Sequence, residues 1–245
     1  MVSGSAPLPV PLYEKWLEIT GHKLLERYGM TEIGMALSNE YDSDRAPGYV
    51  GVPLPGVSIR LLSENNSTIL ECKNKDGVVV LDKAYDTDTK GELLVKGEGV
   101  FKQYFNKPEA TRKEFAEGNW FKTGDICEYC PKNNKFRILG RSSVDIIKSG
   151  GYKISALQIE TVLLAHPDIE ECAVVGIDDE VWGEVVAAIV VTRSGTDLTL
   201  DELRKWAKDK IPKYSLPATL RVVGEIPRNA MGKVNKKELK KSVFP

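Results

Sequence analysis

The stretch GRSSVDIIKSGGYK, residues 140–153, separates two parts of the chain whose sequence patterns differ. Before it, short runs rich in β-branched residues alternate with Gly, Asn and Asp, a pattern that predicts strands joined by turns. After it, helical and strand-like patterns alternate. We therefore expect two domains, residues 1–141 and residues 142–245, each of ordinary domain size.

The same stretch contains the residue types of a binding loop. The planar guanidinium of Arg141 can donate forked hydrogen bonds to phosphate or ribose oxygens. The paired Gly150 and Gly151 leave a length of backbone without side chains, beside which a long, thin ligand can pass.

The first part of the chain is predicted to be rich in strands. Apolar residues at helical spacing predict a helix over residues 11–20, and a second helix over 108–115 has proline in its first turn. Residues 63–89 are polar apart from the strand predicted within them, and they are expected to hold a surface excursion. From residue 57 onward the strand-like runs favour a small antiparallel barrel or sandwich, and we expect the barrel. The predicted strands are 24–28, 57–62, 78–81, 92–95, 126–129 and 135–139.

The second part is predicted to be a compact α+β domain. Its expected helices are 156–165, 200–210 and one that starts at residue 236, and its expected strands are 171–177, 185–192 and 219–223. The fold class expected for the whole chain is therefore α+β, with a β-rich first part and a compact α+β second part.

Composition argues against several classes of function. The 245 residues carry a formal net charge of −1, so no global field favours nucleic acid or an anionic membrane. No apolar run approaches the roughly 20 residues that a membrane span requires. Four cysteines are too few for a disulfide scaffold. Cys127 and Cys130 form a C-x-x-C pair, but on a strand they would point to opposite faces, which favours ordinary packing over a metal or redox site.

The motif YGMTE, residues 28–32, follows a predicted strand. The ring of Tyr28 can lie against a flat base, and Gly29 allows close approach of backbone and ligand. The hydroxyl of Thr31 beside the carboxylate of Glu32 can hold a magnesium ion that carries phosphates. The alternative is an ordinary turn at a strand end with a solvated glutamate.

Two further motifs end in a charged residue. In WFKTGD, residues 120–125, Asp125 at a turn can accept hydrogen bonds from both hydroxyls of a ribose, although Gly-Asp turns are common in proteins of every kind. In PRNAMGK, residues 227–233, Lys233 ends a loop that contains a glycine, from which its ammonium can reach a developing negative charge. The alternative for Lys233 is a solvated side chain in a lysine-rich tail.

In this order and at these separations, the motifs resemble the acyl-adenylate-forming superfamily, which includes acyl-CoA synthetases, luciferases and the adenylation domains of peptide synthetases. The resemblance extends over nearly the whole chain and includes GSAP (4–7), GELLVKG (91–97) and NKPEAT (106–111). Three stretches are similar to malonyl-CoA synthetases in particular: ERYGMTEIGM (26–35), GYVGVPLPGV (48–57), and ILGR (138–141) running into VDIIK (144–148).

The resemblance implies a reaction in two steps. A carboxylic acid, with malonate favoured, attacks the α-phosphorus of ATP and releases pyrophosphate, and the thiol of coenzyme A then displaces AMP. The implied catalytic residues are Lys233, Thr31 and Glu32, and Glu32 would hold Mg²⁺. The implied site for ATP and AMP comprises Gly4, Ser5, Ala6, Pro7, Tyr28, Gly29, Met30, Thr31, Asp125, Arg141 and Lys233. The implied coenzyme A site comprises Gly150, Gly151, Tyr152 and Lys153.

By the same resemblance, residues 1–141 are the C-terminal part of a large AMP-binding domain. Residues 142–245 are a mobile lid, which pivots near Ser143 and Val144 between the two steps. The phosphate loop of the family, a Ser/Thr/Gly-rich run that ends in Pro-Lys, has no match in the chain. We therefore expect the C-terminal portion of an enzyme, inactive or nearly so without its N-terminal part.

Other interpretations remain open. One is a ligase for another short- or medium-chain acid, and another is a naturally short product that binds nucleotide or coenzyme A, or pairs with a full-length subunit, without catalysis. The resemblance favours the mitochondrial matrix, with the cytosol as the alternative. His166 follows a predicted helix end and is expected to interact with the helix dipole rather than to catalyse.

Overall fold

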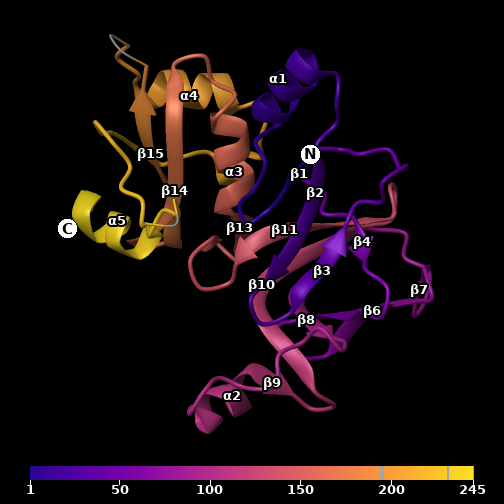
Figure 1. Cartoon of the computed structure of the whole chain (residues 1–245). Helices are drawn as coiled ribbons and strands as arrows, with labels where there is room; N and C mark the ends of the chain where they lie inside the picture. Colours follow the sequence, from indigo (N-terminus) through magenta and orange to yellow (C-terminus); the bar gives the residue numbers. More distant parts are fainter. Residues whose placement is uncertain (194–195, 231, 245) are drawn as a thin grey trace. The chain divides into compact units, whose positions relative to one another are not determined.

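The computed structural model describes residues 1–193, 196–230 and 232–244. The chain forms two compact units (Figure 1). Unit 1 comprises Met1–Leu8 and Leu12–Ile138, and unit 2 comprises Pro9–Pro11 and Leu139–Pro245. Each unit has its own sheets and its own buried apolar residues, and each is described by itself.

The first sheet of unit 1 has four strands in the order β1-β2-β3-β4. They are β1 (Val2–Ser3), β2 (Leu25–Met30), β3 (Gly34–Ser38) and β4 (Val52–Pro53). Strand β1 runs parallel to β2, and the other pairs are antiparallel. The predicted first helix is confirmed as α1 (Val10–Thr20), whose Tyr13 packs with Leu8 and Leu24. The sheet brings the start of the chain beside β2, which ends in the YGM of the first motif.

The second sheet of unit 1 is antiparallel and has the order β11-β10-β8-β5-β6-β7, with β9 paired to β10. Its strands are β5 (Ser58–Leu62), β6 (Thr68–Lys75), β7 (Val78–Leu81), β8 (Thr89–Lys96), β9 (Phe115–Ala116), β10 (Trp120–Cys130) and β11 (Lys135–Arg141). Helix α2 (Pro108–Glu114) precedes β9, as predicted. Apolar side chains such as Ile59, Leu61 and Phe121 form the core of this unit.

The expected small barrel is instead an open sheet. In the part of the chain that the structure describes, β11 and β7 are the outer strands and do not pair with each other. The stretch over residues 63–89, expected to hold a surface excursion, also contains β6, a strand that was not predicted and that lies inside the sheet between β5 and β7. In β6 the buried Leu70 and Cys72 alternate with Glu71 and Lys73, so one face of a polar-looking strand is apolar.

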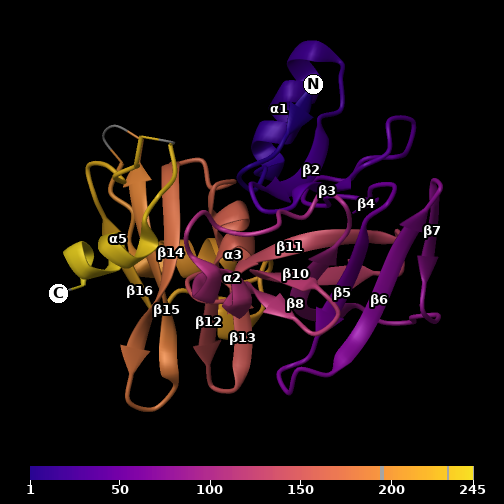
Figure 2. The same ribbon diagram turned by 60° about the horizontal axis from the view of Figure 1, so that its bottom comes forward.

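Unit 2 is a sheet with helices on both faces (Figure 2). The strand order is β13-β12-β15-β14, and β16 runs parallel to β15. The strands are β12 (Ile146–Ser149), β13 (Tyr152–Ser155), β14 (Ile169–Asp179), β15 (Gly183–Thr192) and β16 (Thr219–Val222). The helices are α3 (Ala156–Leu163), α4 (Leu200–Ala207) and α5 (Lys236–Val243). Together with unit 1, these elements confirm the predicted α+β fold class.

Strand β15 shows why its sequence is continuously apolar. Val186 and Ala188 pack in the cluster that contains residues of α3 and α4, whereas Ala187 and Ile189 pack with Leu239 of α5. A strand that is buried on both faces needs apolar residues at successive positions, which explains the run VVAAIVV. Within the described residues, no helix has the length and apolar character that crossing a bilayer requires.

Side-chain caps fix where the helices of unit 2 begin. Thr199 and Glu202 form a reciprocal capping box at the start of α4. Ser155 accepts a hydrogen bond from the N–H of Gln158 at the start of α3, and Asn235 caps α5 in the same way. The cap of α5 lies two residues after Lys233, so this helix start determines where the lysine loop ends.

Candidate functional site

The segment Gly4–Pro7 leaves the first sheet beside the strand that carries the first motif. Because Ser3 pairs with Glu26, Gly4 lies next to Arg27, and a Cβ atom on Gly4 would be 3.2 Å from the Arg27 carbonyl oxygen. Ser5 has a positive φ of 69°, which turns the chain away from β2. The structure therefore brings the GSAP segment and the Tyr28 motif together in unit 1.

Tyr28 also contacts the second motif. Its hydroxyl donates a hydrogen bond of 2.5 Å to Oδ2 of Asp125, a residue that is only 6% exposed. Burial, followed by the charge of Asp125, raises the pKa of Tyr28 far above its usual range, so the phenol stays protonated and donates. The sequence motifs indicated each residue separately but gave no sign of this pair.

A β-bulge places Asp125. The expected turn over residues 120–125 is part of β10, whose pairing with β8 shifts register between Lys122 and Ile126. Gly124 has a φ of 72° within the bulge, a conformation that glycine adopts without strain. The N–H of Asp125 donates to Oγ1 of Thr123 at 3.1 Å, which holds the bulge closed. The bulge therefore does what the turn was expected to do, which is to aim the carboxylate.

Glu32 lies in the turn between β2 and β3. The hydroxyl of Tyr104 donates to its Oε1 at 2.9 Å, and the N–H of Phe101 donates to its carbonyl oxygen at 2.7 Å. The neighbouring Thr31 is exposed. Sequence analysis missed Tyr104, because a tyrosine in a loop some 70 residues away shares no local pattern with Glu32.

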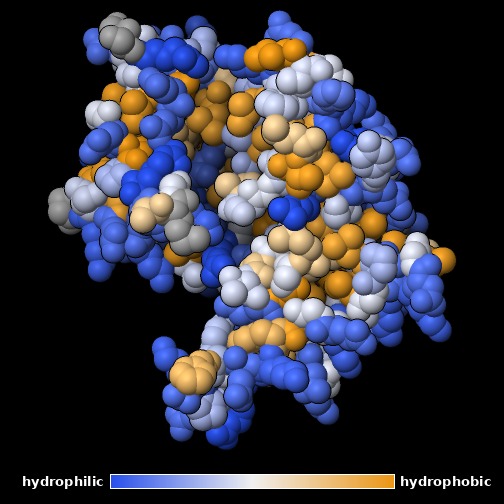
Figure 3. Space-filling view, viewed as in Figure 1, coloured by the Kyte–Doolittle hydropathy of each residue, from blue (hydrophilic) through white to orange (hydrophobic). Residues whose placement is uncertain are grey.

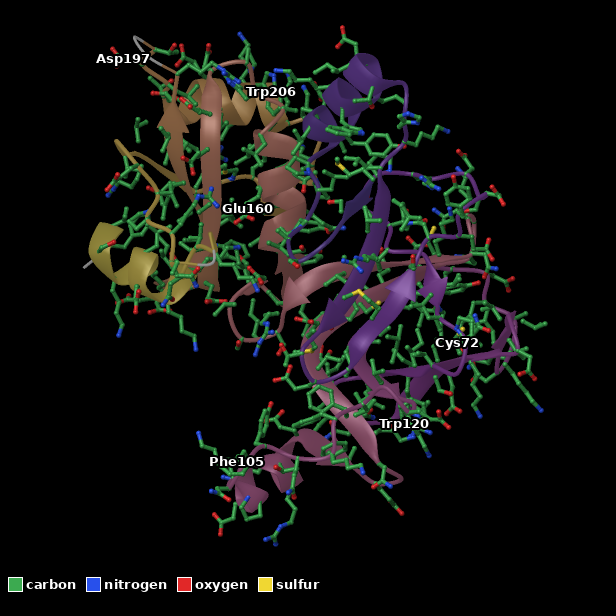
Figure 4. The ribbon with its side chains drawn as sticks, viewed as in Figure 1. Cys72, Phe105, Trp120, Glu160, Asp197 and Trp206 are labelled. Atoms are coloured by element: carbon green, nitrogen blue, oxygen red, sulfur yellow. The ribbon has the colours of Figure 1, made fainter. Side chains whose placement is uncertain are left out.

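The residue after Tyr104 has the opposite orientation. Phe105 is 88% exposed and points into solvent near α2 (Figure 4). Hydrophilic side chains cover most of the visible surface around this helix (Figure 3). Tyr104 therefore contacts Glu32 of the first motif, whereas the side chain of Phe105 is exposed.

Gly29 has a structural reason to be glycine. A Cβ atom there would be 2.1 Å from the carbonyl oxygen of Gly34, because the pairing of β2 and β3 shifts register at this point. The prediction that Gly29 gives room to a ligand is therefore not needed to explain the residue. Met30, the next residue, is partly buried against the core of unit 1.

In unit 2, Arg141 begins a tight turn that Asp145 closes. Oδ2 of Asp145 accepts the N–H of Arg141 at 3.0 Å, and the carbonyl oxygen of Arg141 accepts the N–H of Asp145 at 2.8 Å. Gly140 precedes the turn with a φ of 123°, and a Cβ atom on it would be 2.4 Å from Cβ of Asp145. Arg141 is exposed, and the expected pivot at Ser143 and Val144 lies within the turn.

The stretch expected to contact coenzyme A is the tip of the β12–β13 hairpin. Gly150 and Gly151 have φ values of 54° and 83°. A Cβ atom on Gly150 would be 2.7 Å from the ring of Trp182, whereas one on Gly151 would meet nothing within 4 Å. Tyr152 stacks on Tyr214 with ring centroids 4.2 Å apart. Lys153, the next residue, is exposed.

Lys233 lies on an exposed loop that internal hydrogen bonds shape. The N–H of Lys233 donates to Oδ1 of Asn229 at 3.0 Å, and the N–H of Asn229 donates to the carbonyl oxygen of Lys233 at 2.9 Å. Arg228 anchors the loop through an ion pair of 2.6 Å with Glu171 of β14. Met231, which belongs to the same motif, lies outside the described residues.

His166 does not behave as a charged partner of the helix dipole. Burial lowers its pKa, and its Nδ1 accepts the N–H of Asp168 at 3.2 Å, so the imidazole is neutral at pH 7. The ring lies edge-on to Trp206. The expectation from sequence is therefore corrected, because the residue packs and shapes the loop after α3.

The C-x-x-C pair lies in the packed part of β10. Cys127 and Cys130 are both buried, and burial raises the pKa of the Cys127 thiol. Among the described residues, no group of three potential metal ligands comes together. The two thiols show the environment of packed side chains.

Two family models match the chain. The model described as "AMP-binding enzyme" matches residues 1–105, and the model described as "AMP-binding enzyme C-terminal domain" matches residues 158–233. Among solved structures, ATP-bound MatB from Rhodopseudomonas palustris superimposes with a TM-score of 0.83 at 36% identity, over 98% of this chain and 44% of that one.

Curated proteins are similar over the full length of the chain. The mitochondrial malonate–CoA ligase ACSF3 of Mus musculus is 51% identical over 249 residues, which cover 100% of this chain and 42% of that protein. The malonate–CoA ligase of Arabidopsis thaliana is 46% identical over 253 residues, which cover 99% of this chain and 38% of that protein. The chain therefore spans about two fifths of the length of these relatives.

Proposed function

Because this chain belongs to the family of AMP-binding enzymes, we propose that it is the C-terminal part of an ATP-dependent acid–CoA ligase that acts on malonate. The observation that carries the proposal is the arrangement around Tyr28 in unit 1. The GSAP segment lies beside the strand that carries Tyr28, and Asp125 accepts a hydrogen bond from the Tyr28 hydroxyl. Glu32 follows Tyr28 by four residues. These residues of unit 1 would thus present backbone for a base, a carboxylate for a ribose and a carboxylate for a metal.

In the proposed reaction, an oxygen of the acid's carboxylate forms a bond to the α-phosphorus of ATP, and the bond to pyrophosphate breaks. The sulfur of coenzyme A then attacks the acyl carbon, and AMP leaves with the bonding electrons. The first step brings a carboxylate close to a polyphosphate. Neutralising that negative charge is therefore the main task of the protein.

Unit 1 would hold the nucleoside. Gly4, Ser5, Ala6 and Pro7 would border the adenine together with Tyr28, Gly29 and Met30, and Asp125 would accept the ribose hydroxyls. Thr31 is exposed beside Glu32, so its hydroxyl can reach the α-phosphate. Because Tyr28 already donates to Oδ2 of Asp125, the carboxylate is oriented before the ribose arrives.

Glu32 has the chemistry of a magnesium ligand. Magnesium prefers oxygen ligands and is commonly bound by one or two carboxylates together with substrate phosphates and water. Glu32 is partly exposed, and Tyr104 orients its carboxylate through one hydrogen bond. When bound, Mg²⁺ would supply positive charge beside the phosphates.

Unit 2 would supply two cations, Lys233 and Arg141, and the coenzyme A contact. Lys233 would approach the reacting carboxylate and α-phosphate in the first step, and Arg141 would contact ribose and phosphate. In the second step, Gly150, Gly151, Tyr152 and Lys153 would border the pantetheine chain. We propose residues 142–245 as the lid that pivots between these states, with the tight turn after Arg141 as the pivot.

The choice of malonate and of location comes from similarity. The relatives with 51% and 46% identity are both named malonate–CoA ligases, and the Mus musculus protein is named mitochondrial. We therefore propose malonate as the acid and the mitochondrial matrix as the location. Imaging of the tagged polypeptide against a matrix marker checks the location.

The activity test compares two proteins. One is the polypeptide that the transcript encodes when read upstream of the codon for Met1, and the other is the 245-residue chain alone. We expect the longer polypeptide to release pyrophosphate and to form malonyl-CoA with a higher kcat/KM than it shows with acetate, succinate or octanoate. The 245-residue chain should release almost none.

Each result has a distinct meaning. Robust turnover by the 245-residue chain would contradict its assignment as the C-terminal part of a longer ligase. A preference for another acid would contradict malonate as the substrate. Absence of adenylation with every acid, or of any coding sequence upstream, would favour a module that binds nucleotide without catalysis.

A further inference from the structure

Three buried charged side chains meet inside unit 2. Nζ of Lys236 lies 2.6 Å from Oδ1 of Asp145 and 2.7 Å from Oε1 of Glu160. The side chains of Lys236, Asp145 and Glu160 are 11%, 11% and 14% exposed. They come from the start of α5, the turn after β11 and the middle of α3. None of the three is assigned a contact with substrate in the proposed reaction.

Each carboxylate also holds a backbone group elsewhere in unit 2. Oδ2 of Asp145 accepts the N–H of Arg141 at 3.0 Å. Oε1 of Glu160, which extends from α3 beside β14 (Figure 4), accepts the N–H of Val174 at 2.7 Å. The ammonium of Lys236 therefore connects the turn, α3, β14 and α5 through two shared carboxylates.

The charge of the cluster depends on Lys236. Burial opposes its ammonium, but Glu160 and Asp145 together raise the pKa of Lys236 above its usual value. Burial also raises the pKa of Glu160. Without the ammonium, two buried carboxylates would face each other with no positive charge between them, which disfavours the observed arrangement.

The cluster touches both functional segments of this unit. On one side, Asp145 closes the turn that begins at Arg141. On the other, Lys236 follows Lys233 by three residues, and Val234 between them forms a β-bridge with Arg228. A shift of the first residue of α5 would therefore move the end of the lysine loop.

We infer that Lys236 is a positioning residue, because its ammonium ties Asp145, which closes the turn after Arg141, to the start of α5 and so fixes the end of the Lys233 loop. This inference rests on the proposed function, in which Arg141 and Lys233 contact the nucleotide and the acid. Lys236 touches neither and acts through the segments that carry them.

Half-reaction kinetics in the longer polypeptide test the inference. We expect Lys236→Met to lower kcat for adenylation by about 10-fold or more, because small displacements of a charged group are costly to the reaction it promotes. Thioester formation from supplied malonyl-adenylate should fall by less than about 3-fold, since Lys233 acts only in the first step. Lys236→Arg keeps the charge and should retain most of the adenylation rate.

A matched control lies on the same helix. Lys240 is 3.4 Å from Asp178, whose side chain is 89% exposed, so Lys240→Met removes an ammonium from a solvated pair. Both half-reactions should change by less than about 2-fold in this variant. Equal losses in both half-reactions of Lys236→Met, or no loss, would overturn the inference.

Amide hydrogen exchange on the 245-residue chain gives a readout that does not depend on activity. In Lys236→Met, amides of residues 141–146 and 232–236, and that of Val174, should exchange faster, whereas those of β15 should not change. Uniform acceleration would indicate general destabilisation and contradict the inference. If the unmodified longer polypeptide forms no acyl-adenylate, the proposed function fails, while the exchange comparison still decides whether Lys236 couples the two segments.

A second variant serves if Lys236→Met does not fold. Asp145→Asn weakens the link to the turn while Lys236 keeps its pair with Glu160. The same selective loss of adenylation is expected, and unchanged half-reactions would overturn the inference.

Discussion

The hydroxyl of Tyr28 donates a hydrogen bond of 2.5 Å to Oδ2 of Asp125, across 97 residues of sequence. The bond connects the end of β2 to the bulge in β10, which are strands of two different sheets in unit 1. Two residues that the motifs indicate separately thus form one buried polar pair. Tyr28 orients the carboxylate of Asp125, which we propose binds the ribose.

Tyr28→Phe should destabilise unit 1. The variant removes the hydrogen bond from the Tyr28 hydroxyl to the buried Asp125 carboxylate, and a hydrogen bond to a charged group contributes about 1.5–3 kcal/mol. Urea denaturation measures the loss. Tyr41→Phe is the control, because Tyr41 is 82% exposed, and its stability should stay within about 0.5 kcal/mol of the unmodified chain. Equal stability of the two variants would show that the pair contributes nothing.

Asp125→Ala should weaken AMP binding by the longer polypeptide about 10-fold or more, because hydrogen bonds to a charged group contribute about 1.5–3 kcal/mol. Isothermal titration calorimetry measures the dissociation constant, and circular dichroism checks that the variant folds. Asp42→Ala, at an exposed position, should bind AMP normally. A folded Asp125→Ala protein with unchanged affinity would refute the assignment of Asp125 to the ribose.

Lys233→Ala in the longer polypeptide should lower adenylation by about 100-fold or more, the usual effect of removing a donor that stabilises developing charge. It should largely spare thioester formation from supplied malonyl-adenylate. Lys237→Ala, in the same lysine-rich segment, should have little effect on either step. Pyrophosphate release and malonyl-CoA formation are the two measurements. Equal loss in both steps would contradict the assignment of Lys233 to the adenylation step.

Gly151→Phe should have the opposite effect to Lys233→Ala: it should slow thioester formation more than adenylation. A Cβ atom on Gly151 meets nothing within 4 Å, so the added ring would occupy the space proposed for the pantetheine chain and slow thioester formation. Gly77→Phe controls for backbone strain, because Gly77 has a φ of 87°, similar to the 83° of Gly151, and lies on a hairpin of unit 1. If Gly77→Phe slows the second step equally, strain explains the effect.

Glu26 should make stability depend on pH. Burial raises its pKa from 4.5 to about 7, although the N–H of Gly48 donates to it. The folded state therefore holds this proton more tightly than the unfolded state. The resulting stability is fully present below pH 4.5 and is lost as pH rises through about 7.

Glu26→Gln removes this dependence. The unfolding free energy of Glu26→Gln, relative to the unmodified chain, should rise by about 2 kcal/mol between pH 5 and pH 8 in urea denaturation. Glu14→Gln, at an exposed position on α1, should show no such change. A flat difference for Glu26→Gln would mean that Glu26 ionises normally in the folded chain.

Much of the architecture followed from local patterns. The alternation and composition of the runs predicted β5, β7, β8, β10 and β11, and sequence patterns also predicted the five α-helices of the described residues. Strand β6 was not predicted because Glu71, Lys73 and Asn74 make its sequence look polar, although Leu70 and Cys72 lie on one buried face. The barrel was wrong because closure depends on whether the two outer strands meet, which no local pattern encodes.

The sequence by itself determined the α+β class, the family and the candidate residues, because periodicity and motif spacing are properties of the chain read in order. Only the tertiary structure decided which of those residues meet. The contacts of Tyr28 with Asp125, Tyr104 with Glu32, and Lys236 with Asp145 and Glu160 join segments far apart in sequence. Such contacts arise when strands and helices pack, and packing then gives these polar groups the hydrogen bonds on which the proposed chemistry depends.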